Sequence, residues 1–227
     1  MVQTISTKPI HSLFNQIAHR YDLLNRMLSF GLDQVWRRKV ITFVPQEPNL
    51  KVLDCATGTA DLALMMAQQA RNITQVVGVD IATDMLKIGR EKVERAGFTG
   101  CVELQAGDAH HLAFADASFD LVTVAFGLRN MPGREQALSE MKRVLKPGGR
   151  LIVLEFSMPR NWLIRKGYLV YFRHILPRIG GLISGDYKAY QYLNQSVENF
   201  DASVLSNFSA HPLSMGIATL YVSDSVA

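Results

Sequence analysis

Short apolar runs and helical patterns alternate through the middle of the chain. The pattern predicts strands over Lys51–Cys55, Gln75–Asp80, Val102–Ala106, Phe119–Phe126 and Arg150–Phe156, and helices over Asp61–Ala70, Asp84–Ala96 and Arg134–Leu145. Strands separated by helices form right-handed βαβ units, so we expect an α/β fold with a mostly parallel sheet. The turn Lys146–Gly149 is predicted to end the last helix, and a final strand is predicted over Met215–Val222.

Two helices are predicted before the first strand, within residues 9–44. Apolar residues recur at three- and four-residue spacing from Phe14 to Leu28, and Gly31 breaks the pattern before a second helix around Val35–Phe43. We therefore expect one domain over residues 1–227. It would comprise an N-terminal helical cap (1–48), a cofactor-binding core (49–158), a lid and substrate segment (159–200) and a C-terminal closing strand (201–227).

The predicted lid combines large apolar side chains with positive charge. Residues 162–185 are rich in apolar and aromatic side chains. Between Arg160 and Lys188 there are six Lys or Arg residues and only one acidic residue, Asp186. This composition fits either an ordinary lid helix or an interfacial helix near anionic headgroups. No basic stripe with interleaved stacking aromatics accompanies it, so we expect no nucleic-acid partner.

Composition indicates a globular protein. The chain has 227 residues, 48% of them hydrophobic, and a mean hydropathy of +0.07, which allows a full core. Its two cysteines, Cys55 and Cys101, fall in predicted strands, as small core residues of a protein in a reducing compartment do. Neither a secretory apolar region nor a membrane-spanning run is visible, so we expect a cytoplasmic protein.

A small-residue turn follows the first predicted strand, and an acidic residue ends the second. The turn runs from Asp54 through Gly58 to Asp61, and Asp80 ends the next strand. In parallel α/β sheets such a turn brings backbone N–H groups to a cofactor, and the acidic side chain accepts hydrogen bonds from ribose hydroxyls. The glycine triplet of nicotinamide sites is absent, and Asp61 would repel a pyrophosphate but suit a sulfonium or amino group. This charge argument favours S-adenosylmethionine.

The loop after the third strand is a candidate adenine site. Asp108 could accept a hydrogen bond from the adenine amino group, and the plain alternative is a turn or capping role. Ile81 and Met85 would then face one side of the adenine ring, and Leu112 or Phe114 the other. His110 and His111 lie in the same loop, but no metal-ligand spacing surrounds them, so no metal site is expected.

The segment after the fourth strand is a candidate substrate site. Arg129 and Asn130 lie where the carboxyl edge of the sheet is expected, a position suited to an acceptor oxygen. The plain alternative is that Arg129 forms a surface salt bridge.

Together these motifs resemble the ubiquinone/menaquinone biosynthesis C-methyltransferases over nearly the whole chain, and within them the demethylmenaquinone methyltransferases. The motifs that carry the resemblance are YDLLN at 21–25, SFG at 29–31 with Trp36, the turn from Asp54 to Asp61, GDA at 107–109, FGLRN at 126–130, RVLKPGG at 143–149, LEFS at 154–157, LPRIG at 176–180 and YQYL at 190–193. The resemblance implies a class I, Rossmann-like fold with S-adenosylmethionine as cofactor. It also implies a polyprenyl hydroquinone as substrate, demethylmenaquinol being converted to menaquinol. Segment 162–185 would then contact the lipid tail and attach the protein peripherally to the inner face of the membrane.

The cofactor contacts implied by the resemblance are Thr59, Asp80, Asp108 and Ala109. The neighbouring residues Gly58, Asp61, Ile81 and Ala125 complete the expected cofactor site.

Two departures from the family pattern affect these expectations. Ala60 stands where the family usually has glycine, and it would cost about 1 kcal/mol if its φ were positive. The region after Phe200 is short, so the penultimate strand is expected to be shortened or missing. A six-stranded sheet with an exposed edge would invite pairing in a homodimer.

Methylation at a ring carbon requires electron density beside a phenolic oxygen. We expect Arg129, with Asn130, to orient the substrate and stabilise the developing phenolate. The deprotonating group is open between Tyr21, His110 and a water held by Asp116, with His110 preferred because histidine titrates near neutral pH.

Other functions stay open on the sequence alone. The acceptor could be the benzoquinol precursor of ubiquinone, alone or in addition, or a soluble small molecule methylated at oxygen or nitrogen. The chain could also be a non-catalytic S-adenosylmethionine-binding partner in a quinone-synthesis complex. A nicotinamide-dependent oxidoreductase is the most distant alternative.

Overall fold

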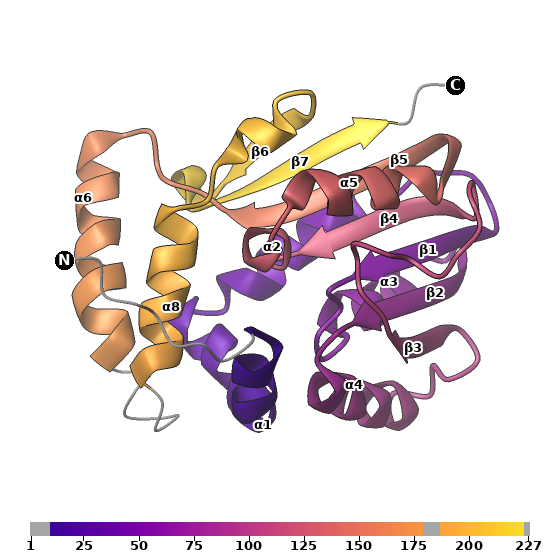
Figure 1. Cartoon of the computed structure of the whole chain (residues 1–227), viewed down its shortest axis with the longest axis horizontal. Helices are drawn as coiled ribbons and strands as arrows, with labels where there is room; N and C mark the ends of the chain where they lie inside the picture. The colour runs from indigo at the N-terminus through magenta and orange to yellow at the C-terminus, as the bar shows by residue number, and fades with distance from the viewer. Residues whose placement is uncertain (1–9, 179–186, 225–227) are drawn as a thin grey trace.

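Seven strands form one mixed sheet in the computed structural model, which describes residues 10–178 and 187–224 (Figure 1). The order along the sheet is β3-β2-β1-β4-β5-β7-β6. The first five run parallel, whereas β7 is antiparallel to both of its neighbours. The strands are β1 Leu50–Cys55, β2 Ile73–Asp80, β3 Val102–Ala106, β4 Phe119–Ala125, β5 Leu145–Phe156, β6 Ser209–Leu213 and β7 Ala218–Asp224. The predicted class I, Rossmann-like fold is thereby confirmed.

Helices cover both faces of the sheet. Side chains alternate between the faces along each strand, so Val52 belongs to one core and Leu53 to the other. The first core packs against α2 (Leu32–Ile41), α3 (Asp61–Gln69) and α4 (Thr83–Arg95), and the second against α5 (Arg134–Arg143) and η3 (Ala202–Leu205). Burial on both faces explains why the central strands read as nearly continuous apolar runs.

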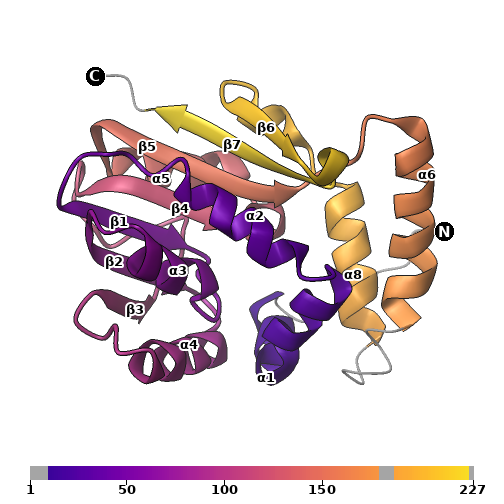
Figure 2. The ribbon, with the colours of Figure 1, turned by 180° about the vertical axis from the view of Figure 1, so that it is seen from behind.

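The remaining helices gather at the carboxyl ends of the parallel strands, where they form a cap (Figure 2). The cap consists of α1 (Ile10–Leu28), α6 (Trp162–Val170), the π-helical turn η2 (Tyr171–Ile175) and α8 (Tyr187–Glu198). Its own small core joins segments far apart in the sequence, because Leu24 and Leu28 of α1 pack with Phe172, Leu176 and Val197. Within the described ranges, none of the helices has the length and apolarity needed to cross a membrane.

The penultimate strand is present, so the expectation that it could be missing and leave six strands is wrong. β6 pairs with β7 over its full length, from Ser209 opposite Val222 to Leu213 opposite Ala218. It has only five residues, two of them half-buried and the other three exposed, so no apolar alternation marks it in the sequence. Pro212 is tolerated because β6 is an edge strand. Pairing of a second copy along this edge stays a prediction.

Two strands begin three or more residues away from the predicted position. β5 begins at Leu145, and the predicted turn Lys146–Gly149 lies inside the strand as an irregularity in its pairing with β4. Met215 belongs to the short turn η4 (Ser214–Gly216), so β7 begins only at Ala218. In both places glycine marks a change of backbone direction, and local signals do not say whether pairing resumes before or after it.

Candidate functional site

A cavity of about 330 Å³ opens at the carboxyl ends of β1, β2 and β4. Ligands of open α/β sheets bind at this edge. Its lining includes nine of the residues expected at the site: Tyr21, Gly58, Asp80, Ile81, Asp108, Ala109, His110, Ala125 and Asn130. Met85 also lines this cofactor cavity, as expected for the adenine site, whereas Leu112 and Phe114 do not.

Asp80 is held rigidly at the end of β2. Its carboxylate accepts hydrogen bonds from the backbone N–H of Gly58 at 2.7 Å and from that of Ala82 at 2.8 Å. Burial raises the pKa of Asp80, and these N–H donors oppose the rise. Each carboxylate oxygen keeps lone pairs for further donors, so the group can receive two hydroxyls of a ribose.

The turn between β1 and α3 takes the left-handed conformation three times. Ala56, Gly58 and Ala60 have φ of 51°, 56° and 62°. Ala60 therefore meets the condition under which alanine costs about 1 kcal/mol relative to glycine.

Asp54 anchors this turn from below. Its buried carboxylate accepts hydrogen bonds from the hydroxyls of Thr57 at 2.7 Å and Thr123 at 2.6 Å. Burial raises the pKa of Asp54 to about 6, against the lowering effect of those two hydroxyls.

Thr59 and Asp61 belong to a polar network outside the cofactor cavity. The Thr59 hydroxyl donates to Asp22 at 2.6 Å, and the Lys92 ammonium bonds both Asp22, at 2.8 Å, and Asp61. Burial would raise the pKa of Asp61, but the positive charges of Lys92 and Arg37 outweigh it, so the pKa is lowered. In this arrangement Lys92 supplies the cation that Asp61 was expected to find in the cofactor. Direct cofactor contacts by these two residues stay a prediction.

The Asp108–His110 pair closes one side of the cofactor cavity. His110 Nδ1 lies 2.6 Å from Asp108 Oδ1, and Nε2 faces the carbonyl oxygen of Pro132. Burial would raise the pKa of Asp108, but the hydrogen bonds from His110 lower it overall. Both ring nitrogens are therefore already engaged by neighbouring protein groups, and neither is directed at the space a phenolic oxygen would occupy. This geometry does not support His110 as the base, and Asp116 is exposed and paired with Arg143.

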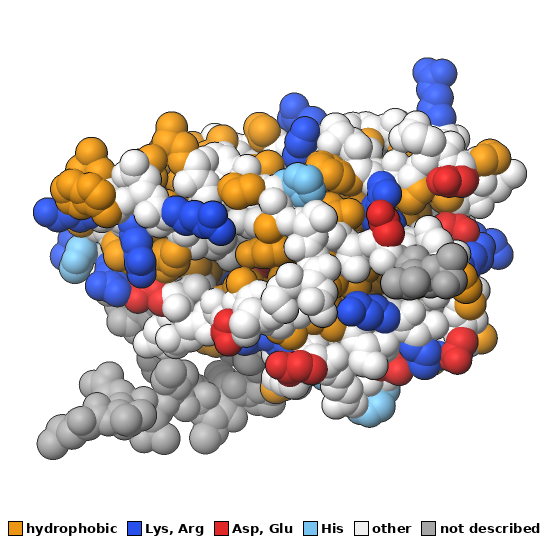
Figure 3. Space-filling model, turned by 90° about the horizontal axis from the view of Figure 1, so that it is seen from above, with side chains coloured by type: hydrophobic (Ala, Val, Ile, Leu, Met, Phe, Trp, Pro, Cys, Tyr) orange, Lys and Arg blue, Asp and Glu red, His pale blue; other side chains and the backbone are white. Residues whose placement is uncertain are grey.

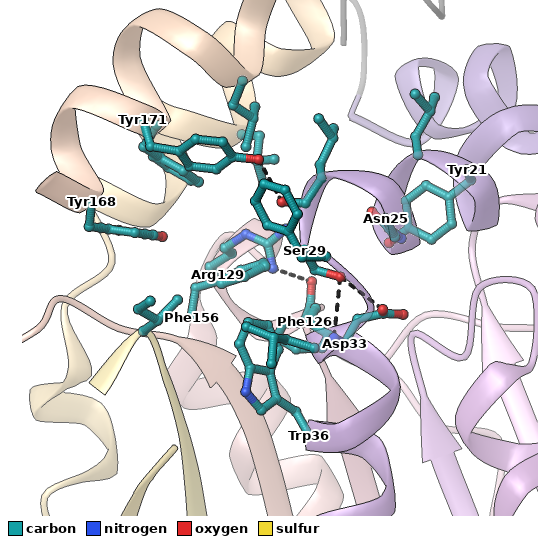
Figure 4. Close-up of a pocket in the computed structure, with 18 of the residues that line it drawn as sticks. Tyr21, Asn25, Ser29, Asp33, Trp36, Phe126, Arg129, Phe156, Tyr168 and Tyr171 are labelled. Carbon is teal, nitrogen blue, oxygen red and sulfur yellow. Dashed lines mark hydrogen bonds between the residues drawn. The ribbon is translucent and has the colours of Figure 1, made fainter. Parts of the chain in front are cut away.

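A second cavity of about 200 Å³ lies under the cap and shares Tyr21 and Phe126 with the cofactor cavity. Figure 4 shows its walls: Tyr21 and Asn25 come from α1, Tyr168 and Tyr171 from α6 and η2, and Trp36 and Phe156 from the floor below. Most of its lining is apolar or aromatic. We call it the cap cavity.

Arg129 lines the cap cavity, and its guanidinium is buried, so it is no surface salt-bridge residue. It forms an ion pair of 2.8 Å with Glu155, which is 0% exposed, and donates to the Phe126 carbonyl oxygen and to Ser196 Oγ. Its neighbour Asn130 faces the cofactor cavity, where its Oδ1 accepts from the Tyr192 hydroxyl at 3.0 Å. Arg129 and Asn130 are adjacent in sequence but line different cavities, the cap cavity and the cofactor cavity.

Sequence reasoning missed the polar residues of α2 at the cap cavity. Asp33 and Arg37 are 4% and 7% exposed, and they share the buried side of this helix with Trp36 and Val40. A charged residue on the apolar face of an amphipathic helix is the signal that could have found them. Glu155, inside an otherwise apolar strand, is a signal of the same kind.

The chain matches the model of the ubiE/COQ5 methyltransferase family over residues 1–209. It is 46% identical over 221 residues to a demethylmenaquinone methyltransferase of Thermus thermophilus, which covers 93% of this chain and 99% of that protein. It is 43% identical over 225 residues, 95% of each chain, to a ubiquinone/menaquinone biosynthesis C-methyltransferase UbiE of Geotalea daltonii.

Among solved structures, a putative S-adenosyl-L-methionine-dependent methyltransferase of Methanococcus maripaludis superposes with a TM-score of 0.65. The match covers 100% of this chain and 98% of that one at 13% sequence identity. At this identity the likeness concerns the fold alone.

Proposed function

This chain belongs to the ubiE/COQ5 methyltransferase family and is an S-adenosylmethionine-dependent C-methyltransferase of quinone biosynthesis, and from this premise we propose its reaction. We propose that it methylates the ring of demethylmenaquinol to give menaquinol. The benzoquinol precursor of ubiquinone is the alternative acceptor, since relatives carry both names.

The observation that carries this proposal is the contact between the two cavities. One is lined by the strand-end groups Gly58 and Asp80, and the other is mainly apolar, yet both are bordered by Tyr21 and Phe126. A methyl donor in the first and a hydroquinone ring in the second would meet at this border. Holding the reacting atoms at about 3–3.5 Å contributes several kcal/mol to such a transfer.

The residues of the cofactor cavity suit S-adenosylmethionine. Asp80 presents a fixed carboxylate to ribose hydroxyls, Ile81 and Met85 offer apolar contact to adenine, and Asp108 lies in the same lining. The cofactor supplies an electrophilic methyl group bound to a positive sulfur. The protein's own contribution is to hold the acceptor ring against it and to exclude water with the aromatic walls of the cap cavity. Orientation of the substrate by Arg129 and Asn130 stays a prediction.

A surface suited to a lipid bilayer lies beside the cap cavity. Trp162 and Leu163 at the start of α6 are 72% and 63% exposed, and the exposed cations Arg165 and Lys166 lie in the next turn of the helix. Figure 3 shows hydrophobic and basic side chains gathered at this end of the molecule. Exposed apolar side chains with cations beside them favour binding to an anionic membrane surface. We therefore propose peripheral attachment to the inner face of the membrane, from which a prenyl tail would reach the cap cavity.

Mass spectrometry tests the reaction directly. The protein is incubated with S-adenosylmethionine and a reduced, short-tailed demethylmenaquinol or benzoquinol precursor. A gain of one methyl on the naphthoquinol ring supports the proposal, and the second substrate shows whether the enzyme serves one pathway or two. Absence of methylation on both, in protein shown to bind the cofactor, would contradict it. Co-sedimentation with anionic and neutral vesicles tests the attachment, which requires binding to the anionic ones.

A further inference from the structure

Arg37 is a buried cation without a partner at the edge of the cap cavity. Its side chain lines the cavity and is 7% exposed, and its Nε is a buried donor without an acceptor. Among the residues that the structure describes, it forms no hydrogen bond and no ion pair; its guanidinium carbon lies 5.3 Å from the centre of the Phe126 ring. Buried charges in proteins are almost always paired, so an unpaired one lining a cavity indicates a ligand of opposite charge.

We propose that Arg37 binds the ionised oxygen of the acceptor ring, and that Asp33 takes the proton which that oxygen loses. This inference rests on the proposed function and deepens it, because it names the residues that activate the hydroquinone.

The contrast with Arg129 supports the assignment to Arg37. Arg129 also lines the cap cavity, but its charge is neutralised by Glu155 at 2.8 Å, and its Nε and one terminal nitrogen bond Ser196 and the Phe126 carbonyl. Attraction of a phenolate by a neutralised guanidinium is weak, whereas the charge of Arg37 is uncompensated within hydrogen-bonding distance.

Asp33 stands four residues before Arg37, and therefore on the same face of α2. Asp33 is 4% exposed, and its carboxylate accepts a hydrogen bond from the Ser29 hydroxyl at 2.9 Å (Figure 4). It accepts a second one from Gln34 Nε2 at 3.1 Å. Despite this spacing, the carboxylate and the guanidinium form no ion pair within 4.0 Å. Both residues line the cavity, so a phenolic O–H placed there can give its proton to Asp33, and Arg37 can stabilise the negative charge that develops on the oxygen.

The step balances as follows. The phenolic O–H bond breaks, its proton goes to the Asp33 carboxylate, and the oxygen lone pair faces Arg37. The ring carbon beside that oxygen then forms a bond to the methyl carbon as the bond from methyl to sulfur breaks, and the sulfur keeps that electron pair. Loss of the ring proton to water restores aromaticity and leaves a phenolate, which takes back the proton held by Asp33 to give the methylated hydroquinone.

The position of Phe126 agrees with this assignment. Its ring packs against Phe156 with centroids 4.6 Å apart, lies under the guanidinium of Arg37, and lines both cavities. A flat acceptor ring lying on Phe126 would reach Arg37 from one side and the cofactor cavity from the other.

Substitution of Arg37 with a matched control tests the catalytic part. Arg38 is the next residue of α2 and is exposed, so Arg38→Gln removes one positive charge from the same helix without touching the cavity. We expect Arg37→Met to lower kcat by about 100-fold with an unchanged Kd for S-adenosylhomocysteine, Arg37→Lys to recover part of the rate, and Arg38→Gln to match the wild type. An unchanged kcat in Arg37→Met would overturn the inference.

A non-reacting probe separates this inference from the proposed function. The probe is 3-prenyl-1-naphthol, bound in the presence of S-adenosylhomocysteine and titrated by its phenolate absorbance. In the wild type and in Arg38→Gln it should ionise about 1 to 3 pH units below the free naphthol, and in Arg37→Met this difference should disappear. The other titratable or charged groups that line the cap cavity are Tyr21, Asp33, Arg129, Tyr168, Tyr171 and Tyr192. Asp54 and Asp61 interact with the charge of Arg37 at longer range. All of these groups are retained in the variants.

The outcomes are distinguishable. Easier ionisation that depends on Arg37, in an enzyme that methylates neither quinol, would support the anion site and contradict the proposed reaction. Methylation of a quinol with ionisation unaffected by Arg37→Met, or a naphthol that does not bind the wild type, would overturn the anion site alone.

Discussion

The two cavities of this enzyme differ in how completely their polar groups are paired. In the cofactor cavity the polar groups are already paired: Asp80 with backbone N–H groups and Asp108 with His110. In the cap cavity, Arg37 Nε and the Tyr168 hydroxyl are buried without partners among the described residues. Strand ends and turns present unsatisfied backbone donors, which fix side chains locally, whereas cap helices satisfy their own backbone and leave side chains unpaired. The polar groups of the cofactor cavity are therefore held in place by the protein itself, whereas two polar groups of the cap cavity remain available to a ligand.

The largest effect should come from unpairing Arg129. Arg129→Met would leave the Glu155 carboxylate buried without its cation, and we expect the free energy of unfolding in urea to fall by about 3–5 kcal/mol. The double variant Arg129→Met/Glu155→Leu should recover much of that loss. If Arg129→Met lowered the free energy of unfolding by less than about 1 kcal/mol, the ion pair would not be a main source of stability at this side of the cap cavity.

A somewhat smaller effect should appear in the pH dependence of stability on the cofactor side. The pKa of Asp54 in the folded protein, about 6, lies above its ordinary value of 3.8. The folded state thus binds this proton more tightly, and the resulting stability is present below pH 3.8 and lost as pH rises through 6. The loss amounts to about 3 kcal/mol. Urea unfolding of the wild type and Asp54→Asn between pH 4 and 7 measures it; equal slopes would contradict the prediction.

The same kind of substitution at Arg37 should have little effect on stability. No carboxylate lies within 4.0 Å of this guanidinium, and its charge acts on Asp54 and Asp61 only at longer range. We therefore expect Arg37→Met to change the free energy of unfolding by less than about 1 kcal/mol. Paired with the Arg129→Met measurement, this gives the sharpest form of the comparison. A loss of 3 kcal/mol at Arg37 would mean that this guanidinium is held by a partner, as Arg129 is, and is not available to a ligand.

The smallest effect is expected at His110. Both ring nitrogens already face acceptors, so His110→Gln should lower kcat by less than about threefold, where loss of a general base would cost about 100-fold or more. Steady-state kinetics at saturating cofactor measure this. A fall of two orders of magnitude would restore His110 as the base and weaken the case for Asp33.

Much of the cofactor side could be predicted from the sequence. The turn after β1, Asp80 at the end of β2 and the loop at Asp108 are each recognisable from residues close in the chain, because strand ends and turns carry local signals. Local reasoning failed where a residue's partner is distant in sequence. It did not predict the ion pair between Lys92 and Asp61 or the one between Glu155 and Arg129. It also did not predict that β6, which has no apolar alternation, pairs with β7.

The sequence by itself determined the alternation of strands and helices, the parallel core and the position of the cofactor turn, because hydrophobic period and glycine or proline breaks act over a few residues. Only the tertiary structure decided which charges are neutralised. Arg129 and Arg37 look equally available in the chain, yet Glu155 from β5 lies against one, and no carboxylate lies within bonding distance of the other. Pairing of buried charges depends on distances between elements far apart in sequence, which are set only when the helices pack on the sheet.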